Sequence, residues 1–308
     1  MKSKHQIYQS GWEQLSNRGE DKYFLKTALT WTGSVTPRVL PRVAASICYS
    51  TAVVVLCNFF PILTISMTPF EYSGAVLTLL LVSRVNAGVD RWWEARKIWG
   101  SIVNQSRNLA LIGFEYSTGV GTIRKSFLGW VACWPHVMRE SLRDERQLSE
   151  VQNLIGPEET KKIYNSVHMP TYVGSRIIQF LKELRHNGLD DFAFQVAERE
   201  RAALIDAIGA CERIKSTPIP LVLAIKMRRF ILLFLLLLPF ALSAKVGWIT
   251  PLVTGLASYP LFSLDEIGAE LQNPFSPRNL SHLPLNKICQ TIESNVMNLW
   301  YSGQEKKM

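Results

Sequence analysis

The sequence lacks charge over two long stretches, and this absence is its most informative feature. No Asp, Glu, Lys or Arg occurs in residues 43–70 or in residues 246–264. A helix needs about 20 apolar residues to cross the hydrocarbon core of a bilayer, and both stretches reach or nearly reach that length. Shorter uncharged runs lie beside them, at 72–83 and 230–244. Either short run alone would also suit a buried helix of a soluble protein, but the paired arrangement predicts two membrane hairpins.

Paired cysteines are also missing. None of the five cysteines is spaced from another as in a zinc site or a short disulfide loop. Cys133 and His136 form an isolated C-x-x-H, which without a second pair indicates structural residues rather than ligands. We therefore expect no metal and no cofactor.

Enzyme motifs are absent as well. The sequence contains no H-E-x-x-H, no P-loop and no G-x-S-x-G. The nearest approach to an acid–base cluster is Asp190-Asp191, close to His186. Because these acids follow Gly188, a residue that commonly ends helices, helix N-capping is the better explanation. The sequence predicts that the chain is not an enzyme.

Basic residues are concentrated beside the apolar stretches. The chain has 34 Lys and Arg against 25 Asp and Glu, a formal net charge of +9. The flanking residues are Lys22, Lys26, Arg38 and Arg42 before the first hairpin; Arg84, Arg91, Arg96 and Lys97 after it; and Arg213, Lys215, Lys226, Arg228 and Arg229 before the second. The predicted outer loops hold only Glu71 and Lys245. This positive-inside pattern predicts a multi-pass protein of the cell (inner) membrane with both termini cytoplasmic, and argues against a nucleic-acid partner.

The remainder of the chain shows helical periodicity and no β-pattern of useful length, which predicts an all-α membrane protein. The expected parts are a cytoplasmic N-terminal arm (1–38), a first transmembrane hairpin (39–90), a cytoplasmic helical region (91–218), a second transmembrane hairpin (219–264) and a cytoplasmic C-terminal segment (265–308). Gly156-Pro157 and Asn187-Gly188 predict breaks between helices. An apolar helix face in the last segment should dock on the cytoplasmic helices or on a neighbouring subunit; it consists of Leu285, Ile288, Ile292, Val296 and Leu299.

The most specific segment is GAVLTLLLVSRVNAGVDRWWEARKIWG, residues 74–100, in which an apolar helix passes directly into charged residues. Arg84 should lie near the cytoplasmic boundary or face a wet interior, because an Arg in lipid costs about 2.5–3.5 kcal/mol. The segment resembles the signature of the bestrophin family, including its bacterial branch, through Arg84, Asn86, Arg91, Trp92, Trp93, Glu94 and Arg96. Similar blocks follow in order: ERIKSTPIP (212–220), RRFILLFLLLLPFAL (228–242), LDEIGAELQNPF (264–275) and LPLNKICQTIE (283–293). The resemblance covers most of residues 30–295.

This resemblance implies a homopentamer around a central pore, with four membrane-spanning helices and a helical cytoplasmic part in each subunit. The second span would line a narrow neck with three rings of side chains, which fall on Ala75, Leu79 and Ser83; the alternative is that these residues pack against neighbouring helices. Ser83 departs from the family, where a bulky aromatic is common, and Ala75 is smaller than the usual branched side chain. A second constriction, the cytoplasmic aperture, would fall on Phe192, which could equally be a core aromatic.

Animal bestrophins carry an acidic calcium clasp directly after an N-P-F motif. Here Asn273-Pro274-Phe275 is followed by Ser276, Pro277, Arg278 and Asn279, so the clasp is missing. The resemblance implies a channel for small monovalent ions, chloride or other anions first, that works in the lipid bilayer. The alternatives are a monovalent cation channel of the same fold and a non-conducting membrane scaffold or signalling protein.

Overall fold

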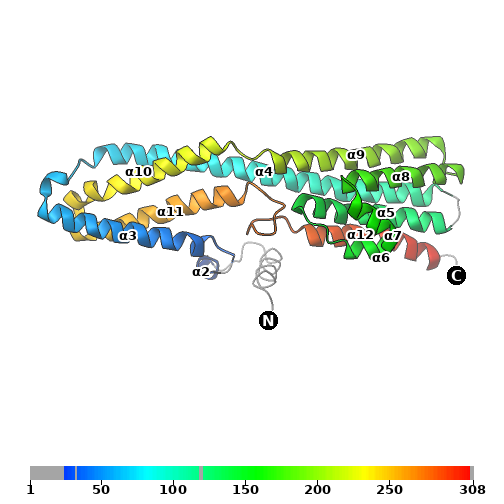
Figure 1. Cartoon of the computed structure of the whole chain (residues 1–308), viewed down its shortest axis with the longest axis horizontal. Coiled ribbons are helices and arrows are strands. Elements are labelled where there is room, and N and C mark those ends of the chain that lie inside the picture. Colours follow the sequence, from blue (N-terminus) through cyan, green and yellow to red (C-terminus); the bar gives the residue numbers. More distant parts are fainter. Residues whose placement is uncertain (1–23, 32, 118–120, 306–308) are drawn as a thin grey trace. The chain divides into compact units, whose positions relative to one another are not determined.

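The structure, a computed structural model, describes residues 24–31, 33–117 and 121–305, and every regular element in those ranges is a helix (Figure 1). The all-α prediction is therefore confirmed. The chain divides into two compact units: unit 1 (1–92, 218–274 and 278–281) and unit 2 (93–217, 275–277 and 282–308). Most of the predicted arm, residues 1–23 and Thr32, lies outside the described residues.

Unit 1 contains the apolar helices. Its elements are α2 (Phe24–Ala28), α3 (Thr36–Phe59), the 3-10 helix η1 (Pro61–Leu63), the first half of α4 (Thr68–Glu115), α10 (Leu221–Val246), η2 (Gly247–Ile249) and α11 (Thr250–Glu270). Proline in the first turn starts both α3 and α11, where its fixed φ suits the helix and its missing N–H leaves no bond unmade. The short η1 and η2 turns reverse the chain between consecutive long helices.

Part of the interior of unit 1 is a cluster of mostly aliphatic side chains. Leu77 and Leu81 of α4 pack with Ile231, Leu235 and Leu238 of α10 in one cluster of buried side chains. Helix α3 packs along α11, and the Ser50 and Thr254 hydroxyls of these helices hydrogen-bond at 3.1 Å. Two polar groups inside an apolar bundle are thereby paired with each other.

Three helical stretches are long and apolar enough to cross a membrane: Thr36–Phe59, Thr68–Glu115 and Asp191–Glu270. The last stretch contains both α10 and α11. Large apolar side chains also point outward from these helices, among them Leu56, Val76, Leu233, Leu236 and Leu252. An exterior of this kind suits hydrocarbon rather than water, in keeping with a membrane protein. The number of helices that span remains a prediction.

Helix α4 is longer than its apolar part. It runs without interruption from Thr68 to Glu115, so the boundary expected between residues 90 and 91 falls inside a helix. The reason is local: no proline follows Pro69 in this stretch, and residues such as Glu94, Ala95 and Arg96 favour helix as strongly as the leucines before them. Unit 1 thus ends, and unit 2 begins, within one continuous helix.

Unit 2 is a helical bundle built around α5 (Gly121–Arg143), which packs against α6, α8, α9 and α12. The other helical parts are the second half of α4, α6 (Ser149–Ile155), α7 (Pro157–Asn165), α8 (Met169–His186), α9 (Asp191–Ser216) and α12 (Leu285–Glu305). Both predicted breaks are confirmed, with Gly156 and Gly188 at φ of 87° and 104°, values that glycine adopts readily. Helix α12 docks on α5, where the Cys289 thiol contacts the Pro135 carbonyl oxygen at 3.2 Å. Leu285, Ile292 and Val296 of the predicted apolar face are buried, so this face docks within its own chain.

His136 lies fully buried on α5, with its Nε2 2.8 Å from the Glu293 carboxylate on α12. Burial, and then the nearby Arg139 guanidinium, hold the pKa of His136 below its usual value, although Glu293 and Glu150 oppose this. The unfolded chain therefore takes up a proton at this residue before the folded chain does. Stability should fall as pH drops below about 6.5, the usual histidine pKa.

We expect His136→Gln to weaken this acid sensitivity, which for one histidine amounts to at most about 1.4 kcal/mol per pH unit. The measurement is the thermal unfolding midpoint between pH 7.5 and 5.5, the window that the lowered pKa defines. His186→Gln, at the exposed end of α8, is the control and should keep the wild-type pH dependence. Equal acid sensitivity of wild type and His136→Gln would contradict the assignment.

Candidate pore helix and its charged flank

Helix α4 has one buried and one exposed face within unit 1. Leu77, Leu81 and Arg84 are buried. Ala75, Leu79 and Ser83, the three residues predicted to form the neck, are all exposed, and 68% of Leu79 is accessible. Their spacing of four keeps them near one side of the helix. The described part of the chain leaves this face uncovered, so it is available to a pore or to another subunit.

Arg84 lies on the opposite face and is only 3% exposed. Its Nη1 forms an ion pair with Oδ1 of Asp265 on α11, while Oδ2 of the same carboxylate accepts a hydrogen bond from Arg228 Nε on α10 at 3.0 Å. The burial of Arg84 is thus offset by a buried carboxylate rather than by water. One aspartate joins α4, α10 and α11.

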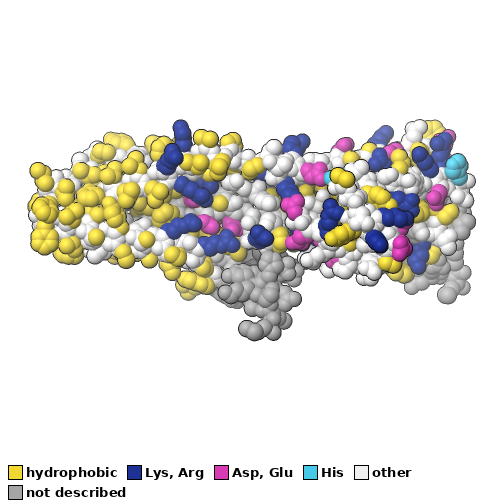
Figure 2. All heavy atoms as spheres, in the orientation of Figure 1, with side chains coloured by type: hydrophobic (Ala, Val, Ile, Leu, Met, Phe, Trp, Pro, Cys, Tyr) yellow, Lys and Arg dark blue, Asp and Glu magenta, His cyan; other side chains and the backbone are white. Residues whose placement is uncertain are grey.

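Further ion pairs connect α11 to α3. Arg38 pairs with Glu270 and lies 3.7 Å from Glu266, and Arg42 Nη1 lies 3.0 Å from Glu266 Oε2. We call the whole set the charged layer; it consists of Arg38, Arg42, Arg84, Arg228, Asp265, Glu266 and Glu270. On the face in Figure 2, basic and acidic side chains gather away from the η1 and η2 turns, whose end of unit 1 is covered by hydrophobic side chains. The layer ties all four long helices of unit 1 together at one level.

Arg91 and Trp92, two residues of the signature segment 74–100, hydrogen-bond to the backbone of the chain that follows α11. Arg91 donates from Nε and Nη2 to the Gln272 carbonyl oxygen, both at 3.3 Å, and Trp92 Nε1 donates to the Ser281 carbonyl oxygen at 2.7 Å. Gly88 permits close approach of the same segment, since a Cβ at residue 88 would lie 2.9 Å from the Leu271 Cβ. Arg91, Trp92 and Gly88 therefore hold the chain that follows α11 against α4.

The remaining flank residues point outward. Asn86, Trp93, Glu94 and Arg96 are exposed, and Glu94 lies 3.5 Å from Arg213 of α9. They are more exposed than Arg91 and Trp92, which are partly buried.

Phe192, the predicted aperture residue, lies in the first turn of α9 and is 84% exposed. The alternative that it is a core aromatic of this chain is therefore wrong. Asp190, just before it, caps α9 by accepting a hydrogen bond from the Ala193 N–H at 2.9 Å, which confirms the capping interpretation of the Asp190-Asp191 pair. Phe192 belongs to unit 2, whereas Ala75, Leu79 and Ser83 belong to unit 1.

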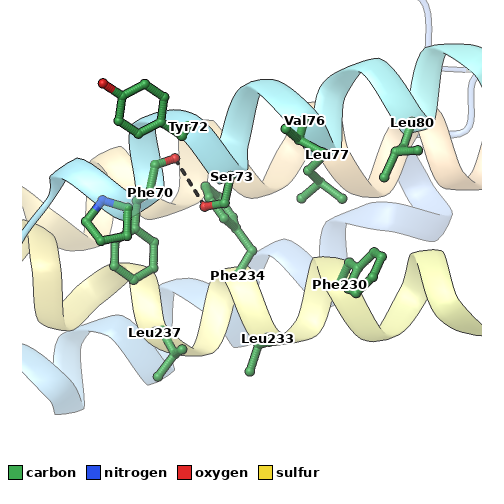
Figure 3. A pocket seen from close by; sticks show the side chains of 11 residues that line it. Phe70, Tyr72, Ser73, Val76, Leu77, Leu80, Phe230, Leu233, Phe234 and Leu237 are labelled. Atoms are coloured by element: carbon green, nitrogen blue, oxygen red, sulfur yellow. Dashed lines mark hydrogen bonds between the residues drawn. The ribbon is translucent and has the colours of Figure 1, made fainter.

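An apolar groove of about 570 Å³ lies between α4 and α10 (Figure 3). It is lined by Pro69, Phe70, Tyr72, Ser73, Val76, Leu77, Leu80, Phe230, Leu233, Phe234 and Leu237. The Ser73 hydroxyl already donates to the Phe70 carbonyl oxygen at 3.5 Å. A groove with this lining suits hydrocarbon or another helix, not a polar substrate.

No group of three His, Cys, Asp or Glu side chains able to hold a metal ion occurs in residues 24–31, 33–117 and 121–305. In the segment after N-P-F, Asn279 Nδ2 donates to the carbonyl oxygens of Glu270 and Asn273, at 3.1 and 2.9 Å. The Glu270 carboxylate is occupied by Arg38 and by the Leu280 N–H. The segment after N-P-F is therefore held by the Asn279 side-chain amide and by the Glu270 carboxylate, which is itself paired with Arg38.

The fold and this site define a class: an integral membrane protein whose apolar helices are joined by a layer of ion pairs and whose second long helix has an uncovered face. The sequence model of the bacterial and fungal bestrophin proteins matches residues 16–298. The chain belongs to the bestrophin family, as its signature segments predicted.

Its relatives support the same assignment. The chain is 32% identical to a voltage-dependent anion channel-forming protein of Nostoc sp., over 90% of this chain and 92% of the relative. It is 31% identical to a protein of that description from Synechocystis sp., over 88% and 90% of the two chains. Among solved structures it resembles a bacterial bestrophin homologue from Klebsiella pneumoniae, with a TM-score of 0.80, 25% identity, and coverage of 85% of this chain and 98% of the other. Family and relatives indicate a membrane channel and not an enzyme.

Proposed function

We propose that this protein is the subunit of a homopentameric channel that conducts small monovalent anions, chloride first, through a central pore lined by α4. One observation carries the proposal: Ala75, Leu79 and Ser83 form an uncovered face on a membrane helix, in a chain whose relatives are described as anion channel-forming. A single chain cannot enclose a pore with one helix, and symmetric assembly converts that face into rings.

In this proposal α3, α4, α10 and α11 cross the cell (inner) membrane as two hairpins, at residues 39–90 and 219–264. The charged layer then lies at the cytoplasmic boundary, where the positive-inside rule places arginines. Residues 91–218 and 265–308 are cytoplasmic, as are both termini. All ion pairs of the charged layer form within one chain, so the membrane part of each subunit does not need a neighbouring subunit to form them.

Leu79 forms the tightest neck ring in this proposal. Five leucine side chains can gate a narrow pore by expelling water, without any charged gate. The smaller Ala75 and Ser83, one turn to either side, leave the pore wider there. Phe192 contributes a separate aromatic ring, the cytoplasmic aperture, from the exposed first turn of α9.

Assembly gives the first test. The mass of the purified protein in mild detergent should equal that of five chains of 34.9 kDa, and liposomes containing it should pass chloride. A monomer or dimer without ion flux would instead favour the scaffold function. A pentamer that passes potassium but not chloride would favour the cation channel.

Calcium should have no effect on conductance. The segment after N-P-F offers no carboxylate between Ser276 and Asn279, and calcium favours several oxygen ligands including acids. Currents in planar bilayers should therefore be equal in a chelator and in micromolar calcium, with magnesium at the same ionic strength as the control. Reversible activation by calcium alone would contradict this expectation.

A further inference from the structure

A second groove, of about 270 Å³, opens on the surface of unit 1 where the charged layer meets the apolar helices. It is lined by Arg42 of α3; Arg228, Ile231 and Leu232 of α10; and Phe262 and Asp265 of α11. Basic and apolar side chains thus share one small cavity on three helices. This groove is distinct from the wholly apolar one between α4 and α10.

The two arginines of this groove are only partly engaged by acids. Arg228 donates to Asp265 through Nε, and Arg42 donates to Glu266 through Nη1. An arginine has five N–H donors, so each guanidinium retains further donors. Their side chains are 54% and 48% exposed, whereas those of Asp265 and Glu266 are 4% and 14% exposed. The acids face inward and the guanidinium groups face outward.

Asp265 also lines the groove, but its charge is shared between Arg84 and Arg228. The charged layer as a whole has four arginines and three acids. An incoming anion therefore meets a surface with an excess of positive charge, which favours phosphate oxygens bound by two guanidinium groups.

The apolar side of the groove continues along α10. Leu232 is exposed beside the arginines, and Leu236, one turn further along the same helix, is also exposed. These residues fall in the uncharged run 230–244. A ligand with a phosphate next to a hydrocarbon chain would match both halves, whereas a free inorganic anion would leave the apolar half unused.

We propose that this groove binds the headgroup of an anionic phospholipid, with Arg42 and Arg228 contacting the phosphate and Leu232 and Phe262 contacting the acyl chain. Basic pockets at the cytoplasmic side of membrane helices suit such headgroups. The bound lipid would add a contact between α3 and α10, which already pack together and share a hydrogen bond from the Tyr49 hydroxyl to the Leu236 carbonyl oxygen. The proposal does not depend on whether the protein conducts ions.

Native mass spectrometry of the intact protein in mild detergent, titrated with phosphatidylglycerol or with phosphatidylcholine of the same acyl chains, tests this proposal. We expect adducts to form preferentially with phosphatidylglycerol. Arg42→Gln should require about tenfold more of it for equal occupancy, the effect of losing roughly one charge-assisted hydrogen bond. Arg229→Gln is the matched control, since Arg229 is exposed next to Arg228 but outside the groove.

Arg228→Gln should weaken phosphatidylglycerol binding in the same way, provided that its elution profile shows intact protein. Both arginines pair with an acid, but Arg228 pairs with the buried Asp265 that also holds Arg84, whereas Arg42 pairs with Glu266. Arg42→Gln leaves the buried pair intact and is therefore the decisive variant. Two results would overturn the proposal: equal binding of both lipids, or equal losses in Arg42→Gln and Arg229→Gln. The thermal unfolding midpoint, measured at constant ionic strength, gives a third test. If inorganic phosphate raises it as much as phosphatidylglycerol does, the groove is a site for a free anion and the proposal is wrong.

Discussion

Replacing Asp265 with leucine should lower the thermal unfolding midpoint of the purified protein by roughly 10 °C, because breaking a buried ion pair costs about 3–5 kcal/mol. Arg84 is 3% exposed and pairs only with Asp265 among the ion pairs of the charged layer. Without that carboxylate its charge would remain in an apolar bundle. Arg228 would suffer less, since it is half exposed and can turn to water.

Two further variants separate this mechanism from a simple loss of packing. Glu266→Gln removes a neighbouring acid whose arginine partners are half exposed, and it should cost no more than about 1 kcal/mol. The double variant Arg84→Met with Asp265→Leu removes both charges and should recover part of the stability lost in Asp265→Leu. Equal losses in Asp265→Leu and Glu266→Gln, or no recovery in the double variant, would contradict a central role for the pair.

Truncating Leu79 to alanine should raise ion flux strongly, by about tenfold for each 1.4 kcal/mol removed from the barrier at the neck. The smaller side chain widens the ring and makes it easier to wet. The measurement is chloride efflux from liposomes containing equal amounts of wild-type or variant pentamer. Because Leu79 is largely exposed within its own chain, the substitution should leave no internal cavity and little change in stability.

Ser83→Phe is the matched opposite change. It adds a second apolar ring one turn from Leu79, and should lower flux while the pentamer stays intact. If Ser83 packs against another helix, the larger side chain would overpack that contact and cost roughly 1–3 kcal/mol. Flux and assembly should therefore be measured on one preparation. Lost assembly, or wild-type flux in both variants, would mean that another face of α4 lines the pore.

Features with a local cause could be predicted from the sequence. The uncharged stretches, the helix breaks at Gly156 and Gly188 and the cap at Asp190 each depend on residues close together in the chain. The charged layer could not be predicted in this way. Arg84 and Asp265 are 181 positions apart, and their pairing depends on how α4, α10 and α11 pack. One signal was present: three acids, Asp265, Glu266 and Glu270, end an otherwise uncharged helix that must cover arginines on its neighbours.

The same limit on prediction from the sequence applies to the charged and aromatic residues between Arg84 and Arg96. Their types indicated a site, but nothing local distinguished Arg91 and Trp92, which hold backbone carbonyl groups, from Trp93 and Glu94, which point outward. The distinction depends on the segment after α11. Similarly, nothing in the sequence determined whether Phe192 was buried.

The reversal potential of the purified protein in a planar bilayer, under a potassium chloride gradient, tests the central claim most directly. A chloride channel should reverse near the Nernst potential of chloride, and Leu79→Ala should increase the current without moving that potential far. Reversal near the potassium potential would contradict anion conduction, and the absence of current from an intact pentamer would contradict the channel itself.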